Sequence, residues 1–198
     1  MAFLFNYASM AHNNQLFFEG LALATRRLED YKSLHDSLVK TFGSIETLKD
    51  TMLETAAAMF GPGFVWLVWS RGQYQAPETV GWRILTTYLA GTPYAEASQR
   101  AQDKDMNTEP AVQNTVGSFG PNSLSGRKER RTGLGGTLVE PMLCVNTWEH
   151  VYMTDYGFDK RAYLEAWWKS IDWEKVDSIA PFEIKGGQRK MAYSRLTI

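Results

Sequence analysis

The triplet Gly-Pro-Gly at residues 61–63 separates two parts of the chain that have different residue patterns. Proline lacks an amide donor and glycine tolerates unusual dihedral angles, so a helix does not continue through such a triplet. Before it, apolar residues recur near helical spacing over 2–25 and at three- and four-residue steps over 28–41, and 45–60 is rich in the good helix formers Ala, Leu, Met and Glu. This spacing predicts three helices, the first of which is apolar enough to be largely buried.

After the triplet, the pattern changes to that of β-strands. Phe64–Ser70, Trp82–Leu89 and Met142–Trp148 are short apolar, β-branched and aromatic runs, which predict three strands, and residues 71–73 predict a turn. Helical spacing returns at Lys160–Ser170. The order of helices, then strands, then helices favours an α+β domain with an antiparallel sheet flanked by helices.

Between the second and third strands lies a long polar segment, rich in Gln, Asn, Ser, Gly and charged residues. A connection of this length inside a compact domain is either functional or disordered. We therefore expect a helical part over 1–60, an α+β domain over 61–180 with a flexible insertion at 95–137, and a basic tail over 181–198.

Composition excludes several classes of protein. No stretch approaches the roughly 20 apolar residues that span a bilayer, so no membrane association is expected. The single cysteine, Cys144, has no partner for an internal disulfide. The first ten residues show neither the basic start of a signal peptide nor an amphipathic transit pattern, which predicts that this chain carries no targeting signal.

The net charge of -1 gives no overall attraction to polyanions, so any contact with nucleic acid must come from a local basic patch. The predicted insertion contains one such patch: Arg127, Lys128, Arg130 and Arg131. These side chains are candidates for contacts to RNA phosphates. The alternative is a solvated loop that touches nothing, as short basic clusters commonly are.

Residues suited to catalysis are scarce. The chain has three histidines, His12, His35 and His150. His150 follows an apolar strand, where a histidine is either hydrogen-bonded structurally or a ligand, and composition alone favours the structural role. The sequence contains no nucleophile elbow, phosphate-binding glycine loop, paired-cysteine zinc motif or metalloprotease helix.

Residues 141–152 read Pro-Met-Leu-Cys-Val-Asn-Thr-Trp-Glu-His-Val-Tyr, which resembles the Asp-x-Trp-Glu-His-x-Tyr signature of iron/manganese superoxide dismutases. Further segments resemble the same family in the same order: 42–44, 60–68, 90–93, 155–156, 163–168 and 172–176. The resemblance implies the α+β fold of that family, with N-terminal helices followed by a three-stranded antiparallel sheet.

Residues 5–18 resemble the second long helix of the family. On this alignment the first helix of the family, which brings the first metal-binding histidine and a gateway tyrosine, would precede Met1 and be absent from this chain. The family binds its metal through three histidines and one aspartate. The resemblance places the second histidine at Asn14 and the aspartate at Asn146, and leaves only His150 in place.

An amide at Asn146 does not supply the anionic oxygen of a carboxylate, and Asn14 does not replace an imidazole. His12 is two positions out of register and so faces elsewhere on a helix. Met10 stands where some members carry an outer-sphere glutamine. The resemblance therefore implies a protein without a bound metal, cofactor or dismutase activity.

In the family, the glutamate and histidine of the Trp-Glu-His motif link two subunits. Glu149, His150 and Tyr152 are present here, which predicts that a dismutase-like dimer surface persists. The alternative is that these residues pack and hydrogen-bond within one chain.

Dismutase-like proteins without a metal site occur in the small subunit of fungal-type mitochondrial ribosomes. The resemblance therefore implies a structural component of that subunit in the mitochondrial matrix, with ribosomal proteins and rRNA as partners. It would pair with a second copy or with a paralogue. The alternatives are a dismutase with a remodelled metal site, and a regulatory module that dimerises with a true dismutase.

Overall fold

The computed structural model describes residues 2–23, 26–73, 76–94 and 139–185. Within them the chain folds around a three-stranded sheet with the strand order β2-β1-β3, and both strand pairs are antiparallel. The strands are β1 (Gly63–Gln73), β2 (Ala76–Tyr88) and β3 (Val139–Asn146). The fold confirms the predicted α+β class and all three predicted strands.

The centre of the sheet is covered on both faces. All five side chains from Phe64 to Val68 are fully buried. Successive residues of a strand point to opposite faces, so burial of five in a row requires packing on each side. The buried indole of Trp66 donates its N–H to Thr87 Oγ1 on β2 at 2.9 Å. The one polar atom of this side chain therefore has a hydrogen-bond partner.

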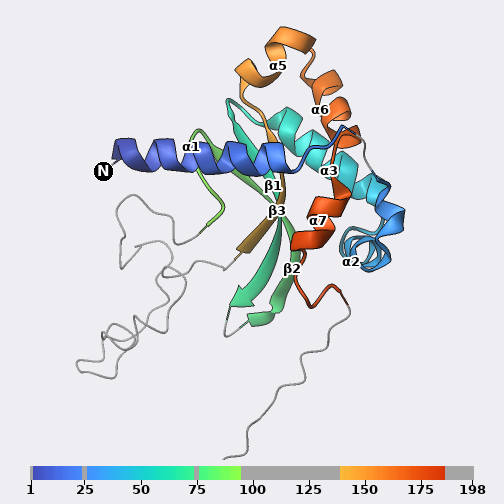
Figure 1. The fold of residues 1–198 in the computed structure, drawn as a ribbon. Helices are drawn as coiled ribbons and strands as arrows, with labels where there is room; N and C mark the ends of the chain where they lie inside the picture. The colour runs from blue at the N-terminus through green and yellow to red at the C-terminus, as the bar shows by residue number, and fades with distance from the viewer. Residues whose placement is uncertain (1, 24–25, 74–75, 95–138, 186–198) are drawn as a thin grey trace, which may run out of the picture.

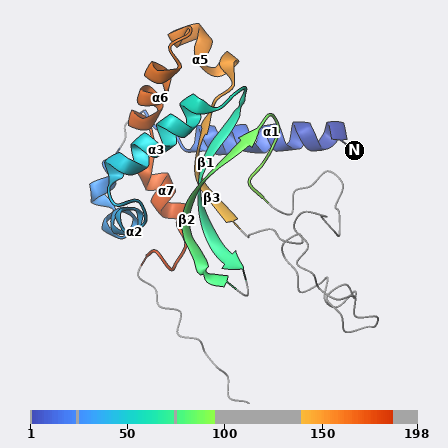
Figure 2. The same cartoon turned by 180° about the vertical axis from the view of Figure 1, so that it is seen from behind.

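The helices of the described part pack around this sheet, with α2, α3, α6 and α7 gathered at the side away from the free end of α1 (Figures 1 and 2). They are α1 (Ala2–Glu19), the short 3-10 helix η1 (Leu28–Asp30), α2 (Lys32–Phe42), α3 (Ile45–Ala58), α5 (Glu149–Tyr156), α6 (Lys160–Lys169) and α7 (Trp173–Ile179). Helix α3 packs on β1 and α6, while α1 and α7 pack on the edge strand β3.

Local signals explain several helix boundaries. Ser44 caps α3 because its hydroxyl accepts a hydrogen bond from the Thr47 amide at 3.0 Å. Gly43 ends α2 with a φ of 86°, a conformation that residues with a side chain rarely adopt. The helix predicted over 28–41 is instead broken into η1 and α2, with Tyr31 between them in a non-helical conformation.

The turn predicted after the first strand was wrong. Residues 71–73 are part of β1 rather than a turn, because pairing continues from Arg71 opposite Val80 to Gln73 opposite Ala76. Arg71 also reaches β3, where its Nε donates to Glu140 Oε1 at 2.6 Å. The hairpin is therefore longer than its apolar residues alone indicated.

Helix α1 is not largely buried, contrary to expectation. Phe3, Leu4 and Tyr7 in its first half are more than 60% exposed, and this half extends beyond the sheet (Figure 1). In its second half, Asn13 and Phe17 are buried. The apolar side chains lie around the whole circumference of α1 rather than on one stripe, so a single contact with β3 covers only some of them.

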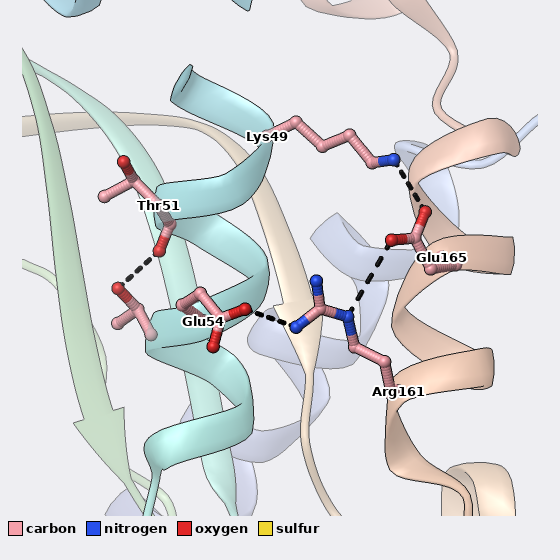
Figure 3. A network of polar contacts seen from close by, with 6 residues as sticks. Lys49, Thr51, Glu54, Arg161 and Glu165 are labelled. Atoms are coloured by element: carbon pink, nitrogen blue, oxygen red, sulfur yellow. Dashed lines mark hydrogen bonds and ion pairs between the residues drawn. The ribbon is translucent and has the colours of Figure 1, made fainter. Parts of the chain in front are cut away.

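An ion-pair network joins α3 to α6 (Figure 3). Lys49 Nζ lies 2.6 Å from Glu165 Oε2, and Arg161 pairs with Glu54 while its Nε lies 3.8 Å from Glu165. The pairs lower the pKa of the Glu165 carboxyl, first through its contact with Lys49. No helix in the described residues is long and apolar enough to cross a membrane.

Candidate functional site

A buried polar group with partners on more than one element is Asn146, at the end of β3. Its side chain is fully buried. The Oδ1 atom accepts a hydrogen bond from the backbone N–H of Trp148 at 2.9 Å, and the Nδ2 atom donates to Asn14 Oδ1 on α1, also at 2.9 Å. The backbone N–H can only donate, so it fixes the orientation of the Asn146 amide. The amide group therefore has to donate towards Asn14.

Two stacked tyrosines hold the backbone at the same position. Tyr163 of α6 donates its hydroxyl proton to the carbonyl oxygen of Asn146 at 2.7 Å. Its ring stacks on Tyr152 of α5, with the ring centroids 5.2 Å apart. Burial raises the pKa of Tyr163 well above the ordinary range, so the hydroxyl stays protonated as a donor. The turn from β3 to α5 is thus fixed from two sides.

Helix α1 is attached to this region by neighbouring polar groups. Asn13, which is buried, donates from Nδ2 to the carbonyl of Gly91 at 2.8 Å, just after β2. The thiol of Cys144 contacts the carbonyl oxygen of Asn13 at 3.8 Å. Burial raises the pKa of this thiol, which therefore stays neutral. Sequence reasoning singled out Asn14 but missed Asn13, whose amide marks the second anchor of α1.

The structure brings together two of the three predicted metal positions. Asn14 and Asn146 are hydrogen-bonded to each other, whereas His150 is exposed at the start of α5, with its ring 5.5 Å from that of Trp148. His12 is also exposed and shares a 3.0 Å hydrogen bond with the hydroxyl of Tyr94. The two histidines are thus engaged with aromatic rings at the surface.

These residues do not fit the metal that a dismutase carries. Both polar atoms of the Asn146 amide are already used, and Asn14 offers a neutral oxygen that is also occupied. Divalent and trivalent iron and manganese ions bind carboxylate oxygens and imidazole nitrogens, and neither asparagine supplies such a ligand. Among the residues that the structure describes, no group of three or more His, Cys, Asp or Glu side chains is placed to hold a metal ion.

The three residues predicted to form a subunit interface differ in their surroundings. Glu149 and His150 are exposed. Tyr152 is 8% exposed and packs inside its own chain against Tyr163. The four predicted RNA-contacting residues, Arg127, Lys128, Arg130 and Arg131, lie outside the described residues, as do the insertion 95–137 and the tail beyond 185.

Comparison with known proteins establishes the family of this chain. The model of the family "iron/manganese superoxide dismutases, C-terminal domain" matches residues 30–100 and 124–179. This match covers more than half of the sequence, so the chain belongs to that family. The match is interrupted at 101–123, and the basic residues 127–131 lie in its second part.

The chain is similar both to ribosomal proteins and to enzymes. It is 29% identical to the small ribosomal subunit protein mS42 of Schizosaccharomyces pombe over 88% of this chain. It is 26% identical to the small ribosomal subunit protein mS43 of the same organism over 87% of this chain. The match spans 65% and 59% of the length of these two relatives. A superoxide dismutase [Fe] of Campylobacter jejuni is 25% identical over 96% of this chain and 68% of the enzyme.

Proposed function

We propose that this chain is a non-catalytic, dismutase-family component of the small subunit of the mitochondrial ribosome. The observation that carries the proposal is the hydrogen bond between Asn14 and Asn146. It joins the two positions that the family resemblance assigns to metal ligands. The names of the two ribosomal relatives support the assignment to a small ribosomal subunit.

The amide pair gives the former metal position a structural role. In a metal site, the two side chains would each direct a lone pair at the ion, and the ion would join the helix to the sheet. Here a neutral donor and a neutral acceptor join α1 to β3 directly. Neutral hydrogen-bonded amides cost far less to bury than unpaired carboxylates, so the connection holds without a cation. On this proposal the protein has no cofactor and no dismutase activity.

We further propose that the chain pairs with a second copy or a paralogue through the surface that carries Glu149 and His150. Both side chains are exposed on the single chain, so they are accessible to a partner. Tyr152 would support that surface from beneath, through its stack on Tyr163. The proposed organisation is a helical part over 1–60 and an α+β domain over 61–180.

Contact with rRNA is proposed for Arg127, Lys128, Arg130 and Arg131 in the insertion 95–137, and the tail 181–198 adds further basic residues. Neutralising these four side chains should weaken assembly and reduce its dependence on salt, because fewer phosphate counterions are displaced. Unchanged incorporation of the variant at raised salt would remove this cluster from the proposal.

The proposal is tested by sedimentation of the endogenous protein from mitochondrial lysate on sucrose gradients at low and high salt. We expect co-migration with the small ribosomal subunit at both salt concentrations. Recovery only in light fractions would contradict the proposal. If the light fractions also contained dismutase activity and metal, a remodelled enzyme or a partner of a true dismutase would replace it.

A further inference from the structure

A pocket of about 350 Å³ lies away from the amide pair, where the segment before α2 meets the junction of α6 and α7. Its lining combines two tryptophans, Trp168 and Trp173, with three cationic side chains: Arg26, Arg27 and Lys169. Glu29 is the one carboxylate in the lining. A volume of this order accommodates a single small-molecule-sized group.

Backbone contacts hold the two sides of the pocket together. The amide of Ala22 donates to the carbonyl of Ser170 at 3.0 Å, and the amide of Asp172 donates to the carbonyl of Gly20 at 2.9 Å. Leu28, which follows Arg27, is buried in the core. These contacts join the segment after α1 to the junction of α6 and α7, and Arg26 and Arg27 line the pocket together with Trp168 and Lys169.

Two of the cations make no ion pair within 4 Å among the described residues, although Lys169 acts on the Glu165 carboxylate and helps to lower its pKa. Arg26 pairs with Glu174 at 3.4 Å, and both side chains are mostly exposed. For Arg27 and Lys169, the described part of the chain contains no ion pair within 4 Å. The pocket therefore carries local positive charge on a protein whose overall charge is -1.

The aromatic wall is rigid. Trp168 is half-buried, and its indole meets Trp173 edge to face, with the ring centroids 5.6 Å apart. Trp173 is itself only 6% exposed and anchors the pair in the core. A partly exposed indole beside unpaired cations is the combination by which proteins bind single-stranded nucleic acid: bases stack on the ring while cations contact the phosphates.

We propose that this pocket binds one nucleotide of a single-stranded RNA segment. The base stacks on Trp168, and Arg27 and Lys169 contact the adjoining phosphates. An acidic peptide would use the cations but would leave the indole face unused, and a duplex has no unstacked base to offer. The inference deepens the proposed function and rests on it for the source of the RNA.

The test measures binding of a fluorescein-labelled, single-stranded RNA of mixed sequence to the full-length purified chain by fluorescence anisotropy, from 50 to 200 mM KCl. We expect the double variant Arg27→Gln/Lys169→Gln to bind at least about tenfold more weakly. Its salt dependence should be shallower by about 1.4 in the log–log slope, since each contact to a single strand contributes about 0.7. The matched control, Lys40→Gln/Arg83→Gln, removes one lysine and one arginine outside the pocket lining and should bind within about twofold of wild type.

Three further variants separate stacking and charge from folding. Trp168→Leu should weaken binding about tenfold, whereas Trp168→Phe retains a ring and should stay within about threefold of wild type. Glu29→Gln should strengthen binding, because it removes the carboxylate nearest the phosphates. A gain of affinity cannot come from misfolding, so this variant keeps the test decisive if Trp168→Leu is unstable.

Equal loss in the pocket and control variants would overturn the inference, as would an unchanged affinity of Arg27→Gln/Lys169→Gln. Competition by polyglutamate as effective as by unlabelled RNA would show an acidic-peptide site instead. Inorganic phosphate that competes as well as RNA would show an anion site without base stacking. If the wild-type chain sediments with the small subunit yet these variants bind RNA normally, the proposed function stands and only this inference fails.

Discussion

The two ends of the segment 146–150, which runs from Asn146 to the Trp-Glu-His motif, differ in how their polar groups are satisfied. At the inner end, Asn146 is fully buried, and both atoms of its amide have partners in the same chain. At the outer end, Glu149 and His150 are exposed at the start of α5. Only a few residues separate a closed hydrogen-bond network from a surface that remains accessible.

This difference shows which role each end can have. The buried amide of Asn146 is hydrogen-bonded within the chain through both its oxygen and its nitrogen, so the inner end contributes to stability. Exposed groups contribute little to the stability of a single chain and are free to contact a partner. Changes at the inner end should therefore alter folding, and changes at the outer end should alter association.

Asn146→Leu should have the largest effect. The substitution nearly conserves volume but leaves the Trp148 amide and Asn14 Oδ1 without partners in the protein. Because stranded buried groups cost about 1–3 kcal/mol each, we expect the free energy of unfolding to fall by about 2–4 kcal/mol in urea titrations. Asn6→Leu, on the exposed part of α1, should change it by less than about 0.5 kcal/mol. Equal effects of Asn146→Leu and Asn6→Leu would show that the buried amide contributes no more to stability than an exposed one.

The thiol of Cys144 provides a local probe of the same contact. It is the only cysteine, it is buried, and it lies against α1 at the Asn13 carbonyl. In the native protein its reaction with an aromatic disulfide reagent should require opening of α1 from β3. Asn146→Leu should accelerate this reaction at least about tenfold. Rapid labelling of the wild-type protein, at the rate of an unfolded chain, would contradict the packing of α1 on β3.

Tyr163→Phe should have a smaller effect. It removes the 2.7 Å hydrogen bond to the Asn146 carbonyl but preserves the ring that stacks on Tyr152. A loss of about 1–2 kcal/mol in the free energy of unfolding is expected. Tyr7→Phe serves as the matched control, because the ring of Tyr7 is 65% exposed. A control effect as large as that of Tyr163→Phe would show that the buried hydroxyl has no special role.

Changes at the outer end should leave folding nearly unaffected. Glu149→Gln and His150→Ala should each shift the free energy of unfolding of the isolated chain by less than about 0.5 kcal/mol. If the proposed pairing uses this surface, the same variants should pair more weakly. In analytical ultracentrifugation they should dissociate from their partner at a higher protein concentration than the unchanged chain. If these variants instead lost stability but paired normally, the exposed end at Glu149 and His150 would serve folding rather than association.

The smallest expected effect concerns the partly exposed ion pairs between α3 and α6. The pKa of Glu165 is lowered in the folded chain, so its contribution to stability is present above the pKa of the unfolded carboxyl, near 4.5, and is lost as the pH falls through the lower folded value. Glu165→Gln should thus cause a slight loss of stability at pH 7 that disappears in acid. A difference that persists at pH 2.5 would show that the residue acts through packing.

Much of the fold could be predicted from local signals. The apolar run at 64–70 predicted a strand, which the structure places at the centre of the sheet, and the match to the dismutase family confirms the fold class. The continuation of β1 through Arg71 could not be predicted, because it depends on pairing with Val80 and contact with Glu140. The exposed first half of α1 was also missed, since its apolar composition does not show how much of it the edge strand covers.

For the candidate site, the sequence predicted which residues are involved but not the contact between them. Family resemblance pointed to Asn14 and Asn146, but a hydrogen bond across 132 positions in sequence depends on the packing of α1 on β3. The pocket at Trp168 was not predicted at all. Its cations come from residues far apart in the sequence, Arg27 and Lys169, and no local pattern brings them together.

On the proposed function, the amide pair stands in the place of a metal ion. This replacement is tested by measuring iron and manganese by mass spectrometry in the endogenous protein isolated from mitochondria, with a superoxide dismutase assay on the same sample. We expect metal far below one ion per chain and no dismutase activity above that of a denatured control. A stoichiometric iron or manganese ion, with activity that disappears on chelation, would contradict it.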